Sequence, residues 1–137
     1  MKERVFADTN ILIYHFTQEV GRYKFTNEIV ANPAHQLVTS TKVLSEFANV
    51  CLRKKFVKGK AEVKAHIEAI AALFEVVGLF DKDILKALDL QERYKISFYD
   101  ALIVANALHA GCQKLYSEDM HNGLHVEKKL KIINPFK

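Results

Sequence analysis

The stretch of sequence that decides the fold lies near the start of the chain and reads Val5-Phe6-Ala7-Asp8-Thr9-Asn10-Ile11-Leu12-Ile13-Tyr14. Residues 4–8 are mostly apolar and compatible with a β-strand, and the triplet Asp8-Thr9-Asn10 favours turns and helix N-caps. Residues 11–16 then carry apolar side chains at helical spacing. The stretch therefore predicts a short buried strand that leads into a helix, with polar side chains at the junction.

The alternation of strand and helix continues along the chain. The pattern predicts further strands over residues 37–39, 75–77, 114–116 and 131–133, and further helices over residues 23–31, 41–52, 61–73, 82–94 and 99–110. We expect Ser40-Thr41, Asp81 and Ser97 to cap three of these helices. Such alternation forms parallel β-α-β units with right-handed crossovers. We therefore expect residues 1–137 to form a single α/β domain, a three-layer α/β/α sandwich around a mostly parallel sheet of four to five strands.

The composition is that of an ordinary globular protein, because 50% of the 137 residues are hydrophobic and 26% are charged. The longest nearly apolar run, residues 69–80, is interrupted by Glu75 and is too short to span a bilayer. The N-terminus shows no apolar signal segment. Cys51 and Cys112 lie inside apolar patterns, which favours buried free thiols, although a disulfide is possible in principle. We expect a cytoplasmic protein that does not contact the membrane.

Four carboxylates fall near the ends of the predicted strands. Asp8 ends the first strand, and Glu46 lies on the helix after the second. Asp100 lies in the first turn of the helix that Ser97 opens, and Asp119 follows the fourth strand. Such positions meet at the carboxyl edge of a parallel sheet, where ligands bind. Each acid also has a simpler explanation, as an N-cap, a solvated helix residue, part of a capping box or a loop acid.

Carboxylates that converge on one edge repel one another. At about 4 Å and an effective dielectric constant near ~20, each pair costs on the order of 4 kcal/mol. A fold stabilised by about 5–15 kcal/mol cannot carry several such pairs without a cation, shared protons or basic partners. An oxygen-only ligand set that leaves room for water favours Mg²⁺ or Mn²⁺. Such an ion activates a water molecule and offsets charge at a phosphodiester.

The same residues carry a family resemblance. The stretch Asp8-Thr9-Asn10-Ile11-Leu12-Ile13-Tyr14 resembles the opening motif of PIN domains. Three later stretches resemble the second, third and fourth motifs of the family, in the right order: Ser45-Glu46-Phe47, Phe98-Tyr99-Asp100-Ala101-Leu102-Ile103-Val104-Ala105 and Leu115-Tyr116-Ser117-Glu118-Asp119. The closing stretch, with Gly123, residues 131–133 and Asn134-Pro135-Phe136, is similar to a branch of VapC-type toxins. The likeness covers essentially the whole chain.

The resemblance implies an Mg²⁺- or Mn²⁺-dependent endoribonuclease that cuts single-stranded or loop RNA. It also implies that the protein is a homodimer and that a cognate antitoxin blocks its acidic site, as in a toxin–antitoxin module. By position, it implies that Asp8, Glu46 and Asp100 hold the metal, with Asp119 completing the set.

Three further residues belong to these motifs. The resemblance implies that Asn10 and Ser117 are supporting polar groups that orient the acids or waters. Glu118 neighbours Asp119, and the sequence does not decide which side chain faces the metal. We favour Asp119 because the family pattern places its acid two residues after the serine or threonine.

A basic segment surrounds the predicted turn at Gly59. It consists of Arg53, Lys54, Lys55, Lys58, Lys60 and Lys64. One interpretation is a solvated junction between two helices. The other is an electrostatic track that binds the RNA backbone without choosing a sequence.

Three other functions are compatible with an α/β fold that carries acidic residues at its sheet edge. A signalling receiver domain needs paired acids after the first strand and a phosphoacceptor aspartate after the central strand. This chain has Asp8-Thr9-Asn10 at the first position and Gly78-Leu79-Phe80 after its third strand, so the receiver interpretation is rejected. A housekeeping PIN nuclease in RNA maturation and a non-catalytic PIN-fold module that binds RNA or protein stay as alternatives.

Overall fold

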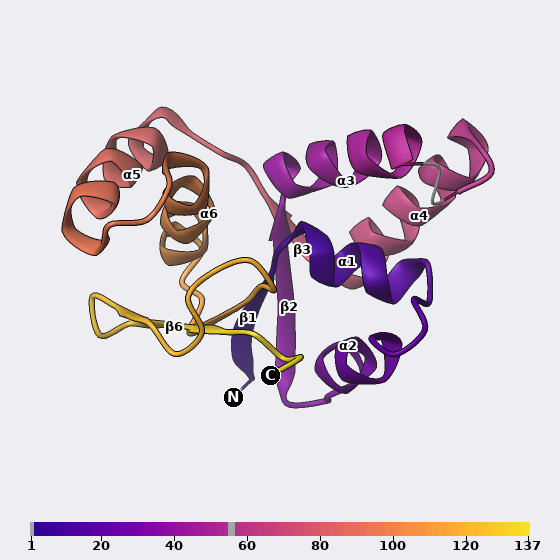
Figure 1. Ribbon diagram of the computed structural model, residues 1–137, viewed down its shortest axis with the longest axis horizontal. Helices are drawn as coiled ribbons and strands as arrows, with labels where there is room; N and C mark the ends of the chain where they lie inside the picture. The colour runs from indigo at the N-terminus through magenta and orange to yellow at the C-terminus, as the bar shows by residue number, and fades with distance from the viewer. Residues whose placement is uncertain (1, 55–56) are drawn as a thin grey trace.

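A six-stranded sheet forms the middle layer of the computed structural model, which describes residues 2–54 and 57–137 (Figure 1). The strands lie in the order β3-β2-β1-β4-β6-β5, and all neighbours are parallel except β5 and β6. Their bounds are β1 Glu3–Ala7, β2 His35–Ser40, β3 Glu75–Val77, β4 Lys114–Tyr116, β5 His125–Val126 and β6 Leu130–Ile133. In register, Phe6 of β1 lies opposite Val38 of β2 and Leu115 of β4.

Helices cover both faces of this sheet (Figure 1). On one side lie α1 (Thr9–Phe16), α2 (Tyr23–Val30), α3 (Thr41–Lys54) and α4 (Lys60–Leu73). On the other side α5 (Asp81–Tyr94) packs against α6 (Phe98–His109). The predicted three-layer α/β/α sandwich with a mostly parallel sheet is therefore confirmed.

The core runs through β1 and α6. Val5, Phe6 and Ala7 of β1 are at most 2% exposed, and all residues from Ala101 to Ala107 on α6 are buried. Burial of each large apolar side chain contributes roughly 1.5–3 kcal/mol. Because Asp8 follows β1 and Asp100 lies in the first turn of α6, both acids are attached to the most firmly packed elements of the protein.

The structure differs from the predicted elements in two places. The described sheet has six strands rather than four to five, because β5 has two residues and is too short to show an alternating pattern. The N-cap of α5 is Phe80 rather than Asp81. The backbone N–H of Phe80 donates to the carboxylate of Asp83 at 2.9 Å, so the acid three residues later reaches back to the cap position.

Both cysteines are free and buried, as the apolar pattern around them predicts. Cys51 lies on α3, and Cys112 lies just before β4. Within residues 2–54 and 57–137, no helix has the length and apolar character needed to cross a membrane.

Candidate active site

Asp8 stands at the carboxyl end of β1 and is 8% exposed. It is the N-cap of α1, and its Oδ1 accepts a hydrogen bond of 2.8 Å from the backbone N–H of Thr9. Its Oδ2 accepts a second bond of 2.8 Å from the hydroxyl of Ser117. The simpler explanation as a helix cap is therefore true of Asp8, but one carboxylate oxygen is held by the loop after β4 rather than by α1.

Burial raises the pKa of Asp8 to about 6. The hydrogen bonds from Thr9 and Ser117 lower the pKa, whereas the negative charges of Glu46 and Asp119 raise it further. Asp8 is thus a buried carboxyl group that loses its proton at a higher pH than an ordinary aspartate does. A neighbouring cation would favour its charged form.

Asp100 lies on α6, on the opposite side of the sheet from α1, and the same causes act on its pKa. Burial is the largest cause that raises its pKa, a hydrogen bond from Ser97 lowers it, and the charges of Asp119 and Glu46 raise it. The hydroxyl of Ser97 also accepts from the backbone N–H of Asp100 at 3.2 Å, so the predicted cap of α6 is confirmed. Asp8 and Asp100 therefore feel the same two neighbouring charges, and the fold brings the four predicted acids to one edge of the sheet.

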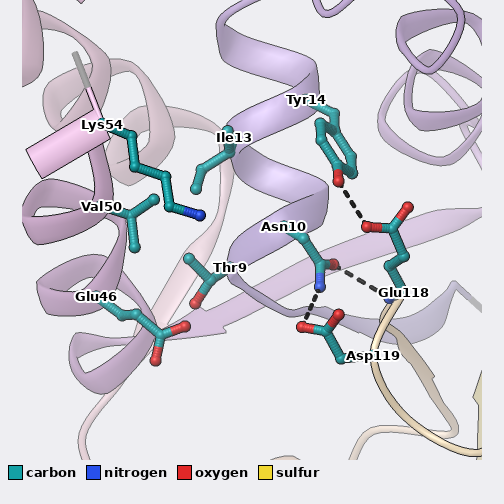
Figure 2. Close-up of a pocket in the computed structure, with 9 residues that line it drawn as sticks. All are labelled: Thr9, Asn10, Ile13, Tyr14, Glu46, Val50, Lys54, Glu118 and Asp119. Atoms are coloured by element: carbon teal, nitrogen blue, oxygen red, sulfur yellow. Dashed lines mark hydrogen bonds between the residues drawn. The ribbon is translucent and has the colours of Figure 1, made fainter. Parts of the chain in front are cut away.

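The loop after β4 is fastened to α1 by Asn10. Its side-chain amide donates to Asp119 Oδ2 at 2.9 Å, and its carbonyl oxygen accepts from the backbone N–H of Glu118 at 3.2 Å (Figure 2). Ser117 Oγ accepts from the backbone N–H of Asp119 at 3.3 Å while donating to Asp8. Asn10 and Ser117 thus each form a hydrogen bond with one of the four predicted acids.

Glu118 has partners of its own. Its carboxylate accepts a hydrogen bond of 2.5 Å from the hydroxyl of Tyr14 and one of 3.1 Å from Arg22 Nε (the Tyr14 bond is drawn in Figure 2). The guanidinium of Arg22 also lies over the rings of Tyr14, at 4.9 Å, and Phe136, at 5.7 Å. Burial, followed by the hydrogen bond to Glu118, raises the pKa of Tyr14 to about 12. Among residues 2–54 and 57–137, a cation pairs with Glu118, whereas none pairs with Asp119.

The sequence did not single out Arg22. It follows a glycine in the α1–α2 connection and reaches Glu118 across 96 positions of the chain. No local sequence pattern marks such a pair.

A cavity of about 270 Å³ opens beside these acids, between α1, α3 and the loop after β4 (Figure 2). It is lined by Thr9, Asn10, Ile13, Tyr14, Glu46, Val50, Lys54, Glu118 and Asp119. Of the four predicted metal ligands, the exposed Glu46 and Asp119 line it, whereas Asp8 and Asp100 do not. Glu46 and Asp119 thus lie close enough to raise the pKa values of Asp8 and Asp100, although the four carboxylates do not all line the same cavity.

The donor chemistry at this edge fits a hard divalent cation. No lysine, arginine or histidine in the described part of the chain forms an ion pair with any of the four acids, so basic partners do not compensate them. Among residues 2–54 and 57–137, however, no three His, Cys, Asp or Glu side chains already converge closely enough to hold an ion. An ion would be held only after side chains of this set, such as the exposed Glu46, change rotamer.

The predicted basic segment does not gather at the site as a whole. Its described members are all exposed, and of these Lys54 lines the cavity, whereas Arg53, Lys58, Lys60 and Lys64 do not. Lys55 lies outside the described residues.

Comparisons with known proteins agree with this architecture. A sequence model of the PIN domain family matches residues 5–121. A toxin–antitoxin complex from Klebsiella pneumoniae contains a chain of similar fold, with a TM-score of 0.72, 18% identity, and coverage of 96% of this chain and 97% of that one. VapBC2 from Rickettsia felis, bound to a DNA fragment from their promoter, gives a TM-score of 0.69 at 17% identity and covers 96% and 99%.

A third similar structure is Mycobacterium tuberculosis VapC20, described as a sarcin–ricin loop cleaving toxin. Its TM-score is 0.66 at 20% identity, and the match covers 81% of this chain and 86% of that chain. None of the curated proteins matches the sequence. At such low identities the structural likeness shows the shared fold.

Proposed function

The chain belongs to the PIN domain family, and from that premise we propose that it is a metal-dependent endoribonuclease and the toxin of a VapBC-type toxin–antitoxin module. One observation carries the proposal. Burial raises the pKa values of Asp8 and Asp100, the negative charges of Glu46 and Asp119 raise both further, and the described residues supply no cation that pairs with any of the four acids. A structural neighbour described as a sarcin–ricin loop cleaving toxin supports the reaction class.

In the proposed mechanism Asp8, Glu46, Asp100 and Asp119 hold Mg²⁺ or Mn²⁺. When bound, such an ion makes water more acidic and offsets charge on the phosphate oxygens. Asp8 is oriented for this role by Thr9 and Ser117, which each hold one of its oxygens.

The remaining groups of the loop have positioning roles. Asn10 holds the Asp119 carboxylate. The hydrogen bonds from Tyr14 and Arg22 keep the Glu118 carboxylate turned toward these two side chains and away from the proposed metal. Water loses a proton as it attacks phosphorus in line, the bond to the 3′ oxygen breaks, and that oxygen takes up a proton to become a hydroxyl, so the other product carries a 5′-phosphate. No histidine among the described residues lines the cavity, so we assign no histidine as general base.

Three further parts of the proposal follow from the family and the surface. We propose that residues 1–137 act as one domain in the cytoplasm and that a cognate antitoxin covers the acidic cavity. The homodimer would form through α5, because Ile84, Leu85 and Leu88 lie on one exposed apolar stripe. Phe80 and Tyr99 are also exposed.

The experiment that tests the proposal incubates purified, antitoxin-free protein with a labelled structured RNA. Parallel reactions contain Mg²⁺, Mn²⁺ or EDTA, and the same reactions are run with Asp8→Asn and Asp100→Asn. We expect cleavage that needs the metal and disappears in both variants, with 5′-phosphate ends. Cleavage that survives in the variants would contradict the assigned site, and 2′,3′-cyclic phosphate ends would contradict the mechanism. RNA binding without cleavage, together with no effect of metal on the melting temperature, would favour the non-catalytic alternative.

A further inference from the structure

Helix α3 presents a stripe of three residues to the cavity, formed by Glu46, Val50 and Lys54. They are four residues apart, so they lie on one face of the helix, and roughly 12 Å of helix separates the first from the last. The opposite wall is formed by Thr9, Asn10 and Ile13 of α1. The cavity is therefore a short groove between two helices, with a carboxylate at one end and an ammonium group at the other.

The side chain of Lys54 is directed into this groove. Figure 2 shows its stem beside Ile13 and Val50, with the ammonium group pointing inward from the end of α3. Helical side chains lean toward the N-terminus of their helix, which carries this ammonium group toward the end where Glu46 lies. Lys54 lies in the last turn of α3, where a cation also meets the helix carbonyl groups favourably.

Lys54 is the one basic side chain among the described residues that line the groove, and it forms no ion pair with a carboxylate in the described part of the chain. It differs in this from Arg22, which is committed to Glu118. The ammonium group of Lys54 can therefore pair with a negative charge on a ligand. The nearby acids would bind a second negative charge of the same ligand through a metal ion. A ligand with negative charges spaced along its length fits both. A nucleic-acid strand has this chemistry, because each nucleotide adds one phosphate.

We propose that Lys54 binds the backbone phosphate next to the one that is cut, so that one RNA strand lies in the groove between α1 and α3. This inference rests on the proposed function and deepens it. It separates Lys54 from the rest of the basic segment, whose described members lie outside the groove. The ammonium group positions the RNA strand and adds to its affinity, but it does not distinguish one base from another.

The test compares variants that each remove one positive charge. Lys54→Met keeps the length of the stem beside Ile13 and Val50, Lys58→Met removes a charge from the same basic segment, and Lys82→Met removes one from the distant α5. Binding of a short fluorescein-labelled single-stranded RNA, with Ca²⁺ in place of Mg²⁺, is measured by anisotropy at several salt concentrations. The melting temperature of each variant checks that it is folded.

We expect Lys54→Met to raise the Kd about tenfold, the loss typical of one hydrogen bond to a charged group. The slope of log K against log salt should fall by about 0.7, the value for one phosphate contact on a single strand. Lys58→Met and Lys82→Met should change Kd by less than about threefold, and Lys54→Arg should recover most of the affinity because it keeps the charge. Amide NMR signals of Asn10 and Ile13 should shift on addition of the RNA in the wild type and shift less in Lys54→Met.

Equal losses in Lys54→Met and Lys58→Met would overturn the inference in favour of a diffuse electrostatic track. If the wild type cuts RNA with metal in that case, the inference fails while the proposed function stands. If the wild type neither binds nor cuts RNA under any of these conditions, both fail together.

Discussion

At the scale of single residues, Asp8 combines burial with a charge that the metal-free protein cannot compensate. Its folded-state pKa of about 6 lies above the ordinary value of 3.8. The folded state therefore holds this proton more tightly than the unfolded state does. The free energy of unfolding falls as the pH rises from about 4 to about 6, and above that range the loss contributed by Asp8 is complete.

We predict that Asp8→Asn stabilises the protein in EDTA at pH 7.5, by about 2–3 kcal/mol if the whole shift is recovered. The amide oxygen can still accept from the backbone N–H of Thr9, and the NH₂ group can donate to Ser117 Oγ. At pH 4.5 the difference should be much smaller, because the wild-type carboxyl group is then largely protonated. Thermal unfolding followed by circular dichroism at the two pH values measures both effects. A variant less stable than the wild type at pH 7.5 would contradict the prediction.

A metal should reverse this order of stability. Mn²⁺ at a hundredfold excess over its Kd should stabilise the wild type by about 2.7 kcal/mol, since it binds the folded state alone. Asp8→Asn and Asp100→Asn should gain much less at the same concentration, and EDTA should cancel the gain in the wild type. A melting temperature that rises equally in all three proteins would place the ion elsewhere.

At the scale of elements, the loop after β4 is positioned by contacts that lie far apart in sequence. Asn10 binds two of its residues, Arg22 and Tyr14 hold Glu118, and the side chain of Asn134 donates to the Glu118 carbonyl oxygen at 3.2 Å. These contacts fix the backbone that carries Asp119. The loop therefore behaves as part of the framework rather than as a free connection.

We predict that Arg22→Met lowers the rate of RNA cleavage on the order of ten- to a hundredfold, because Glu118 loses its cation and the backbone that carries Asp119 loses one of its anchors. The melting temperature should change little, because the ion pair is partly exposed. Arg93→Met is the matched control, since Arg93 also pairs with a glutamate, Glu127, at 3.1 Å but on α5. Its cleavage rate should stay within about twofold of the wild type, as expected for a surface pair. Equal rates in the two variants would show that Arg22 does not position the site.

The sequence predicted the elements better than the contacts between them. The strands at residues 75–77 and 114–116 and the Ser97 cap are found as predicted, because each depends on a local run of residues. The two-residue β5 and the Phe80 cap were missed, because neither shows a local pattern. The four acids were placed at one edge by the rule for parallel sheets. The partners of Glu118 could not be foreseen, because they depend on which loops meet in three dimensions.

At the scale of the whole molecule, the apolar stripe on α5 predicts how two copies associate. Leu85 is 65% exposed, with Ile84 and Leu88 beside it on the same face. Leu85→Glu should convert a dimer into a monomer, because the charge would be buried without a partner at the interface. Leu73→Glu on α4, which alters a leucine of similar exposure, is the control and should leave the dimer intact. Light scattering after size exclusion gives the masses, and a monomeric wild type would contradict the assignment.

The pairing of β4 with β6 determines when, during synthesis of the chain, the loop that carries Asp119 can take its final position. The backbone N–H of Ser117 donates to the carbonyl oxygen of Ile133, and Asn134 secures the residue after Ser117. Asp8, Glu46 and Asp100 leave the ribosome long before these late residues do. The nascent chain therefore carries three of its acids early but cannot fix the loop with the fourth until β6 has emerged from the exit tunnel. In the proposed ribonuclease, this order would delay completion of the site while its own messenger RNA is being translated.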